Sequence, residues 1–252
     1  GVPVVKHGNR AASSKCGGAD MLEALGVDIE RDPEGIREDA AKTNFAFMYS
    51  KTYHPAMRFA APVRSELAVP TLFNLLGPMT NPATPRYGLI GCAFRDMMPI
   101  MGGAFAHQGA RVLVVRGMDG MDEISVCAPT EVVTVDETGL TSEATINPAA
   151  LGLNYHEEGA LTGGDAAYNA QVAIDLFNGE LEGAIKDAVL ISAAGALTAV
   201  RGWTDRITPE NGYSTHEAIR EVMKEELQIA REALESGAAK QTLQRILGKS
   251  VN

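Results

Sequence analysis

The chain has 252 residues, of which 45% are hydrophobic and 21% charged, and its formal net charge at pH 7 is −10. This length and composition are those of an ordinary folded protein with a sizeable core, and no run approaches the roughly 20 apolar residues of a membrane span. The negative charge disfavours nucleic acid and anionic membranes as partners, although local positive charge is enough to bind a phosphate ligand. Cys16, Cys92 and Cys127 follow no metal-binding or disulfide pattern, which favours a reducing cytoplasm.

The N-terminal stretch predicts a strand, a polar loop and a helix. Val2–Val5 is apolar enough to end a buried strand, and a helix over Ala19–Leu25 stops at Gly26. The loop between them carries two lysines, a histidine, an asparagine, an arginine and two serines, and it ends in Gly17 and Gly18. Cationic side chains and backbone N–H groups between a strand and a helix N-terminus are typical of an anion site. The alternative is an ordinary polar turn, because the spacing matches neither the P-loop nor the dinucleotide fingerprint.

From residue 32 to residue 108 the pattern alternates between helices and short apolar strands. Asp32 followed by Pro33 is a typical helix start, and apolar residues after His54 recur at helical spacing. The expected elements are a helix from Asp32, a strand over Phe45–Tyr49, a helix from His54, a strand or buried turn over Thr71–Leu76, a strand over Tyr87–Cys92 and a helix over Asp96–Gln108.

Arg111–Arg116 is the clearest strand in the chain. Its continuous β-branched and leucine character predicts a parallel strand covered on both faces. It leads into a glycine-containing loop with Asp119, Asp122 and Glu123. Ligands gather at the carboxyl ends of parallel strands, and adjacent carboxylates suit Mg²⁺. A solvated turn is the alternative interpretation of such a pair.

The remainder predicts one more strand and then helices. The expected elements are a strand over Glu131–Asp136, an irregular connection through Glu158, a helix over Ala166–Phe177 capped by Asp165, a buried helix over Lys186–Val200, an amphipathic helix over Ser214–Ser236 and a last helix over Ala238–Leu247. Strands that alternate with helices, without repeats or a clear boundary, predict a single α/β domain over residues 1–252. We expect a mostly parallel central sheet flanked by helices.

Five blocks of this sequence together resemble one known family. The blocks are Lys6–Gly26, which contains KHGNR-x-x-SS, then His54–Leu67, Thr71–Pro82, Gly117–Glu123 and Leu161–Asp165. In this order, and over essentially the whole chain, they are similar to the anthranilate phosphoribosyltransferases of tryptophan biosynthesis. The resemblance implies the large domain of the nucleoside phosphorylase/phosphoribosyltransferase-like fold, and transfer of a phosphoribosyl group from phosphoribosyl pyrophosphate to anthranilate.

The resemblance also implies a set of site residues. The residues implied for anthranilate are Asn9, His54, Met57, Arg64, Gly77 and Pro78. Among them, Arg64 would bind the carboxylate of anthranilate. Those implied for phosphoribosyl pyrophosphate are Lys6, His7, Gly8, Asn9, Ser13 and Ser14. Asp122 and Glu123 would hold the Mg²⁺ that bridges the leaving pyrophosphate. No residue is implied as a covalent catalyst.

Two alternatives stay open beside this function. Family members begin with a small helical domain and a glycine-rich phosphate loop, so the chain resembles the C-terminal two-thirds of such an enzyme. It would then be a catalytically incompetent fragment that is poorly soluble or associates, and the homodimer that the family suggests would be in doubt. A related pentosyl transfer, nucleoside phosphorolysis, is disfavoured by Arg64 and Leu76–Pro78, because a nucleobase has no carboxylate.

Overall fold

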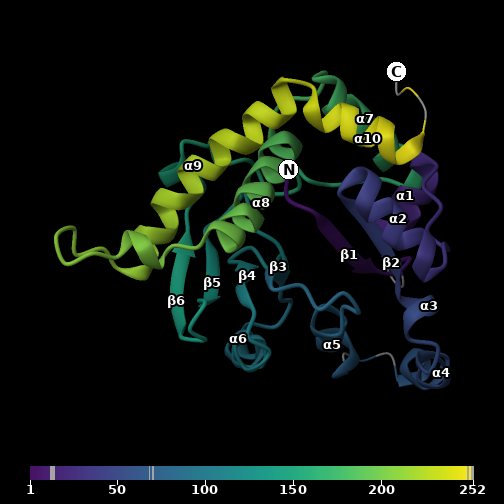
Figure 1. Cartoon of the computed structure of the whole chain (residues 1–252), viewed down its shortest axis with the longest axis horizontal. Coiled ribbons are helices and arrows are strands. Elements are labelled where there is room, and N and C mark those ends of the chain that lie inside the picture. The colour runs from purple at the N-terminus through teal and green to yellow at the C-terminus, as the bar shows by residue number, and fades with distance from the viewer. Residues whose placement is uncertain (12–14, 68, 70, 249, 251–252) are drawn as a thin grey trace. The chain divides into compact units, whose positions relative to one another are not determined.

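The computed structural model describes residues 1–11, 15–67, 69, 71–248 and 250, and for residues 61, 64 and 65 it describes the backbone alone. The chain forms two units, and each unit is assembled from stretches that are separate in the sequence (Figure 1). The first unit comprises residues 1–84, 162–180 and 237–252, and the second comprises residues 85–161 and 181–236. The single-domain organisation stays a prediction.

The first unit is built on two parallel strands, β1 (Val4–Gly8) and β2 (Phe45–Tyr49). They pair from Val4 opposite Phe45 to Gly8 opposite Tyr49, so both strands end at the same edge of the sheet. The helices of this unit are α1 (Gly18–Leu25), α2 (Pro33–Thr43), α3 (Ser50–Tyr53), α4 (Met57–Leu67), α5 (Phe73–Met79), α7 (Ala166–Asn178) and α10 (Ala238–Leu247).

Helices bury both faces of β2. Phe47 packs with Ala19 of α1, whereas its neighbour Ala46 packs with Ile36 of α2. Successive side chains of a strand point to opposite faces, so α1 and α2 cover opposite sides of β2.

The second unit contains a four-stranded sheet in the order β3 (Tyr87–Gly91), β4 (Arg111–Gly117), β5 (Thr130–Val135) and β6 (Thr141–Ile146). β3 runs parallel to β4, while β4 with β5 and β5 with β6 are antiparallel. The helices of this unit are η1 (Arg95–Met97), α6 (Met98–His107), η2 (Pro148–Leu151), α8 (Ala184–Arg201), η3 (Thr204–Arg206) and α9 (Thr215–Glu235).

Helices also cover both faces of this larger sheet. Val132 belongs to the main core with Ile191 of α8 and Ile219 of α9. The next residue, Val133, points to the other face, where a Cβ added to Gly102 of α6 would lie 2.7 Å from its Cγ1. None of the described helices has the length and apolar character needed to cross a membrane.

The α/β class with helices flanking the sheets is confirmed. Residues Val112–Val115 are at most 1% exposed, as expected for a strand covered on both faces. The expectation of a mostly parallel sheet is corrected, because the pairing in the second unit is mixed. β5 and β6 are joined by residues 136–140 alone, and a connection this short joins antiparallel neighbours.

Two expected elements were wrong. Thr71–Leu76 is neither a strand nor a buried turn, because its last four residues belong to α5, where the side chain of Asn74 accepts the N–H of Thr71 at 2.9 Å. Short apolar runs fit strand and helix equally well. The region expected to be an irregular connection contains β6, a partly exposed edge strand whose polar composition hid its alternation.

Two adjacent glycines of α6 predict opposite effects on stability. A Cβ at Gly102 would overlap the stiff β-branched side chain of Val133, whereas a Cβ at Gly103 would meet nothing within 4 Å. We expect Gly103→Ala to raise the free energy of unfolding by up to about 1 kcal/mol through helix propensity. Gly102→Ala should lower it, because overpacking costs about 1–3 kcal/mol. Urea unfolding measures both, and equal effects would contradict this packing.

Candidate functional site

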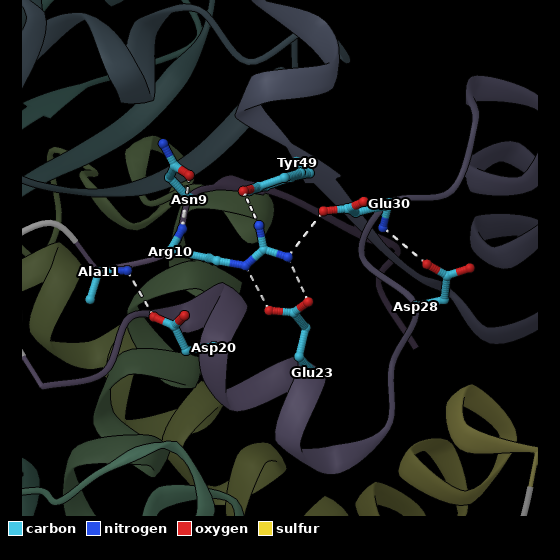
Figure 2. Close-up of polar contacts among 8 residues, drawn as sticks. All are labelled: Asn9, Arg10, Ala11, Asp20, Glu23, Asp28, Glu30 and Tyr49. Atoms are coloured by element: carbon cyan, nitrogen blue, oxygen red, sulfur yellow. Dashed lines mark hydrogen bonds and ion pairs between the residues drawn. The ribbon is translucent and has the colours of Figure 1, made fainter. Parts of the chain in front are cut away.

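Arg10 ties together the elements that surround the loop after β1 (Figure 2). Its guanidinium donates to both carboxylate oxygens of Glu23, at 2.8 and 2.6 Å, and to Oε1 of Glu30 at 3.0 Å. Nη1 donates to the hydroxyl of Tyr49, whose ring centre lies 4.8 Å from the guanidinium carbon. These hydrogen bonds raise the pKa of Arg10, and Arg10 lowers the pKa of Glu23. The arginine therefore joins the end of β1 to α1, to the segment before α2 and to the end of β2.

Asp20 closes the same loop from α1. Its Oδ2 accepts the backbone N–H groups of Ala11 and Gly17, both at 2.8 Å, and these bonds lower the pKa of the carboxyl group. A Cβ at Gly17 would lie 2.6 Å from the nitrogen of Ala11, so this close approach requires glycine. Two N–H groups of the predicted anion loop are thus bound by the chain itself. The signal was visible in the sequence, since an acidic residue three positions after a helix cap is capping-box spacing.

The other predicted phosphate-binding residues occupy different positions along β1 and its loop. Lys6 is exposed and lies beside the start of α1, where a Cβ at Gly18 would be 3.8 Å from its Nζ. Gly8 packs against the ring of Phe47, 3.2 Å from the position of a Cβ. Asn9 is exposed, and its Oδ1 accepts the N–H of Arg10 at 2.9 Å (Figure 2). Ser13 and Ser14 lie outside the described residues.

Three segments of the first unit meet at His7. Its Nδ1 lies 3.2 Å from the carbonyl oxygen of Gly77, and its ring centre lies 5.0 Å from that of His54, edge to face. A carbonyl can only accept, so Nδ1 carries the proton. Nε2 is buried without a hydrogen-bond partner among the described residues. Burial, and to a smaller extent the neighbouring His54, lowers the pKa of His7, although the hydrogen bond to Gly77 raises it.

The remaining residues implied for anthranilate lie on α4 and α5. Met57 begins α4, and Pro78 lies inside α5 next to Gly77. Arg64 is part of α4, but its side chain lies outside the described part, so its role stays a prediction. Sequence analysis missed Asn81, whose Nδ2 donates to the carbonyl of Val5 at 3.1 Å and fixes the chain after α5 to β1.

Asp122 and Glu123 belong to the second unit and follow β4. Both are exposed, and carboxylate oxygens are the hard ligands that Mg²⁺ prefers. Within the described residues, no group of three or more His, Cys, Asp and Glu side chains is arranged to hold a metal. The loop therefore offers a pair of carboxylates, which fits an ion that shares its other positions with water and phosphate.

Comparisons with known proteins give one consistent result. A family described as glycosyl transferase family, a/b domain, matches residues 1–240. The chain is 71% identical over 249 residues to an anthranilate phosphoribosyltransferase of Corynebacterium jeikeium (strain K411), covering 99% of this chain and 65% of that protein. It is 44% identical over 245 residues to one of Mycolicibacterium vanbaalenii, covering 97% of this chain and 64% of that protein. The chain thus spans less than two thirds of these curated relatives.

Solved structures share the fold. The anthranilate phosphoribosyltransferase of Thermus thermophilus superposes with a TM-score of 0.84 at 40% identity, over 98% of this chain and 68% of that one. The enzyme of Saccharomyces cerevisiae in complex with PRPP and Mg has a TM-score of 0.80 at 22% identity, over 97% of this chain and 64% of that one. The second likeness concerns the fold alone.

Arg10→Lys tests the Arg10 network. Lysine keeps the charge but cannot donate to both oxygens of Glu23 and to Tyr49 at once. We expect faster hydrogen exchange of the backbone amides in the loop after β1 and in α1, measured by mass spectrometry. Arg37→Lys is the matched control, because the ion pair of Arg37 with Glu34 is exposed and 3.5 Å long. Unchanged exchange in Arg10→Lys would show that the network does not hold the loop.

The surroundings of His7 predict a pH dependence of stability. Its pKa in the folded protein lies below the ordinary value of 6.5, so the unfolded chain binds a proton at a pH where the folded chain does not. The free energy of unfolding should therefore fall as the pH drops through 6.5, and level off below the folded pKa. Denaturant unfolding of His7→Gln should show a flatter dependence. An NMR titration of the His7 ring with a midpoint above 6.5 would refute this.

Proposed function

We propose that this chain forms most of the catalytic part of an enzyme that transfers a phosphoribosyl group from phosphoribosyl pyrophosphate to anthranilate. The chain belongs to the glycosyl transferase family with the a/b domain and, within it, to the anthranilate phosphoribosyltransferases. The product would be N-(5-phosphoribosyl)anthranilate, with release of pyrophosphate, in tryptophan biosynthesis. The observation that carries this proposal is the 71% identity over 99% of the chain.

The first unit would bind both substrates. For anthranilate, the guanidinium of Arg64 would pair with the carboxylate, since its planar fork matches two oxygens. Asn9 would lie between acceptor and donor. The residues that would line the aromatic ring are His54, Met57, Gly77 and Pro78. Those that would contact the ribose and its phosphates are Lys6, His7, Gly8, Ser13 and Ser14.

The second unit would bind the metal. Asp122 and Glu123 would hold Mg²⁺, which the pair of exposed carboxylates supports; the yeast enzyme of the same fold was solved with PRPP and Mg. When bound, the ion would neutralise charge on the departing pyrophosphate. The thiols of Cys92 and Cys127 are free, which supports a cytoplasmic location, where thiols stay reduced.

The chemistry requires no nucleophilic side chain. The lone pair of the arylamine nitrogen forms the bond to C1 of the ribose while the bond from C1 to the pyrophosphate oxygen breaks, and pyrophosphate leaves with that electron pair. The nitrogen then loses one proton to solvent. An arylamine is already unprotonated at neutral pH, so the protein has to orient the two substrates and stabilise charge on the leaving group.

A chimera tests this function. The segment of the Corynebacterium jeikeium enzyme that this chain does not match would be joined to the 252 residues. We expect the chimera to consume anthranilate, seen as a fall in its fluorescence, when phosphoribosyl pyrophosphate and Mg²⁺ are added. The chain alone is assayed beside it, which tests the fragment hypothesis. A folded but inactive chimera, beside an active intact relative, would overturn the proposed function.

Variants of the chimera separate the two substrate sites. Arg64→Ala should raise KM for anthranilate by roughly 10- to 100-fold, since hydrogen bonds to charged groups contribute about 1.5–3 kcal/mol. Arg58→Ala on the same helix is the control and should leave KM unchanged. Asp122→Ala/Glu123→Ala should abolish the dependence on Mg²⁺ together with turnover. An unchanged KM in Arg64→Ala would remove the proposed carboxylate contact.

A further inference from the structure

The side chain of Asp119 holds the chain on both sides of the Asp122–Glu123 pair. Its Oδ1 accepts the backbone N–H of Met121 at 3.2 Å, immediately before the pair. Its Oδ2 accepts the hydroxyl of Ser125 at 2.5 Å, two residues after the pair. One carboxylate thus connects Met121 to Ser125, and both proposed metal ligands lie between these two residues.

Ser125 is the fixed end of this bridge. It is completely buried, and its hydroxyl oxygen accepts the N–H groups of Cys127 and Ala128 at 2.9 and 3.0 Å. Its own N–H donates to the hydroxyl of Thr130, the first residue of β5, at 2.9 Å. The hydroxyl of Ser125 therefore connects Asp119 to a segment that is anchored in the sheet.

Close backbone packing fixes the rest of the loop. The N–H of Gly117 donates to the carbonyl of Met121 at 2.8 Å, which closes the turn that carries Asp119. A Cβ at Gly91 of β3 would lie 1.9 Å from the carbonyl oxygen of Asp122. Ile124, which follows the pair, is 1% exposed and packs under α8. The pair thus stands on a rigid backbone while its own side chains reach solvent.

These contacts give Asp119 a role different from that of the pair. Both of its oxygens already accept hydrogen bonds from the loop, and the described residues contain no cluster of three potential ligands. We propose that Asp119 and Ser125 are positioning residues, which preorganise Asp122 and Glu123 to bind a divalent cation. This inference rests on the metal site of the proposed function. Two adjacent carboxylates repel each other, so a rigid loop removes part of the cost of bringing them to one ion.

Direct metal binding tests the inference without activity. Mn²⁺ binding to the 252-residue chain would be titrated by the loss of the free Mn²⁺ EPR signal, for the wild type, Asp119→Asn, Ser125→Ala and the double variant. Loss of a group that orients metal ligands weakens metal affinity by about 10- to 100-fold. We expect at least about a tenfold loss in each single variant, and a double variant no weaker than the weaker single one, because both residues act through one contact.

A similar Asp–hydroxyl turn in the same unit provides the control. Oδ1 of Asp136 accepts the N–H and the hydroxyl of Thr138, at 2.8 and 2.7 Å, at the β5–β6 turn. Thr138→Ala removes a comparable hydrogen bond away from the acidic loop, so it should leave Mn²⁺ affinity unchanged. Thermal unfolding of all metal-free variants separates loss of folding from loss of binding.

Each other outcome overturns a specific statement. Weaker binding in Asp119→Asn with normal binding in Ser125→Ala would make Asp119 a ligand instead of a positioning residue. Additive losses in the double variant would show that the two residues act separately. Wild-type affinity in Asp122→Ala/Glu123→Ala would remove the metal site itself, and with it the metal part of the proposed function. Loss of binding in Asp122→Ala/Glu123→Ala, with normal binding in Asp119→Asn and in Ser125→Ala, would overturn this inference alone.

Discussion

Both candidate loops depend on a carboxylate that accepts hydrogen bonds from two separate points of the same loop. Asp20 does this after β1, where it binds the N–H groups of Ala11 and Gly17. Asp119 does it after β4, where it binds Met121 and Ser125. Each loop follows a strand that has a parallel neighbour, and such strand ends present polar groups at the edge where ligands gather. The two bridges therefore help to hold Ala11 and Gly17 in the first loop, and Met121 and Ser125 in the second, in fixed positions.

The sequence predicted the helices well because their signals are local. Asp32, Asp165 and Ser214 cap helices that begin at the next residue, as their types and spacing indicated. The failures have an equally local cause. Thr71–Leu76 is a short apolar run without a decisive period, and the polar edge strand β6 looks like a loop when its partner is unknown.

The sequence named candidate residues for the site, whose roles stay predictions, but it did not predict their contacts. The resemblance supplied the blocks, yet it did not show that Arg10 is bound to Glu23, Glu30 and Tyr49. Tyr49 is 39 positions away along the chain, and the two meet because β1 and β2 end side by side. Contacts of this kind depend on the pairing of strands, which no local pattern encodes. The hydrogen bond from Ser125 to Asp119 joins residues only six positions apart. It can hold the loop because Ser125 is buried, and the sequence does not show that burial.

The contacts also change how positive the first loop is. Arg10 contributes little to the attraction of an anionic ligand, because Glu23 and Glu30 both bind its guanidinium. At pH 7 His7 adds little positive charge, because burial lowers its pKa in spite of the hydrogen bond to Gly77, which raises it. Lys6 and Lys15 are the other cations of this stretch, in a chain whose net charge is −10. A pyrophosphate-bearing substrate carries more negative charge than these two lysines neutralise, so the proposed reaction would also draw on a divalent cation, whose proposed ligands lie in a loop held by Asp119 and Ser125.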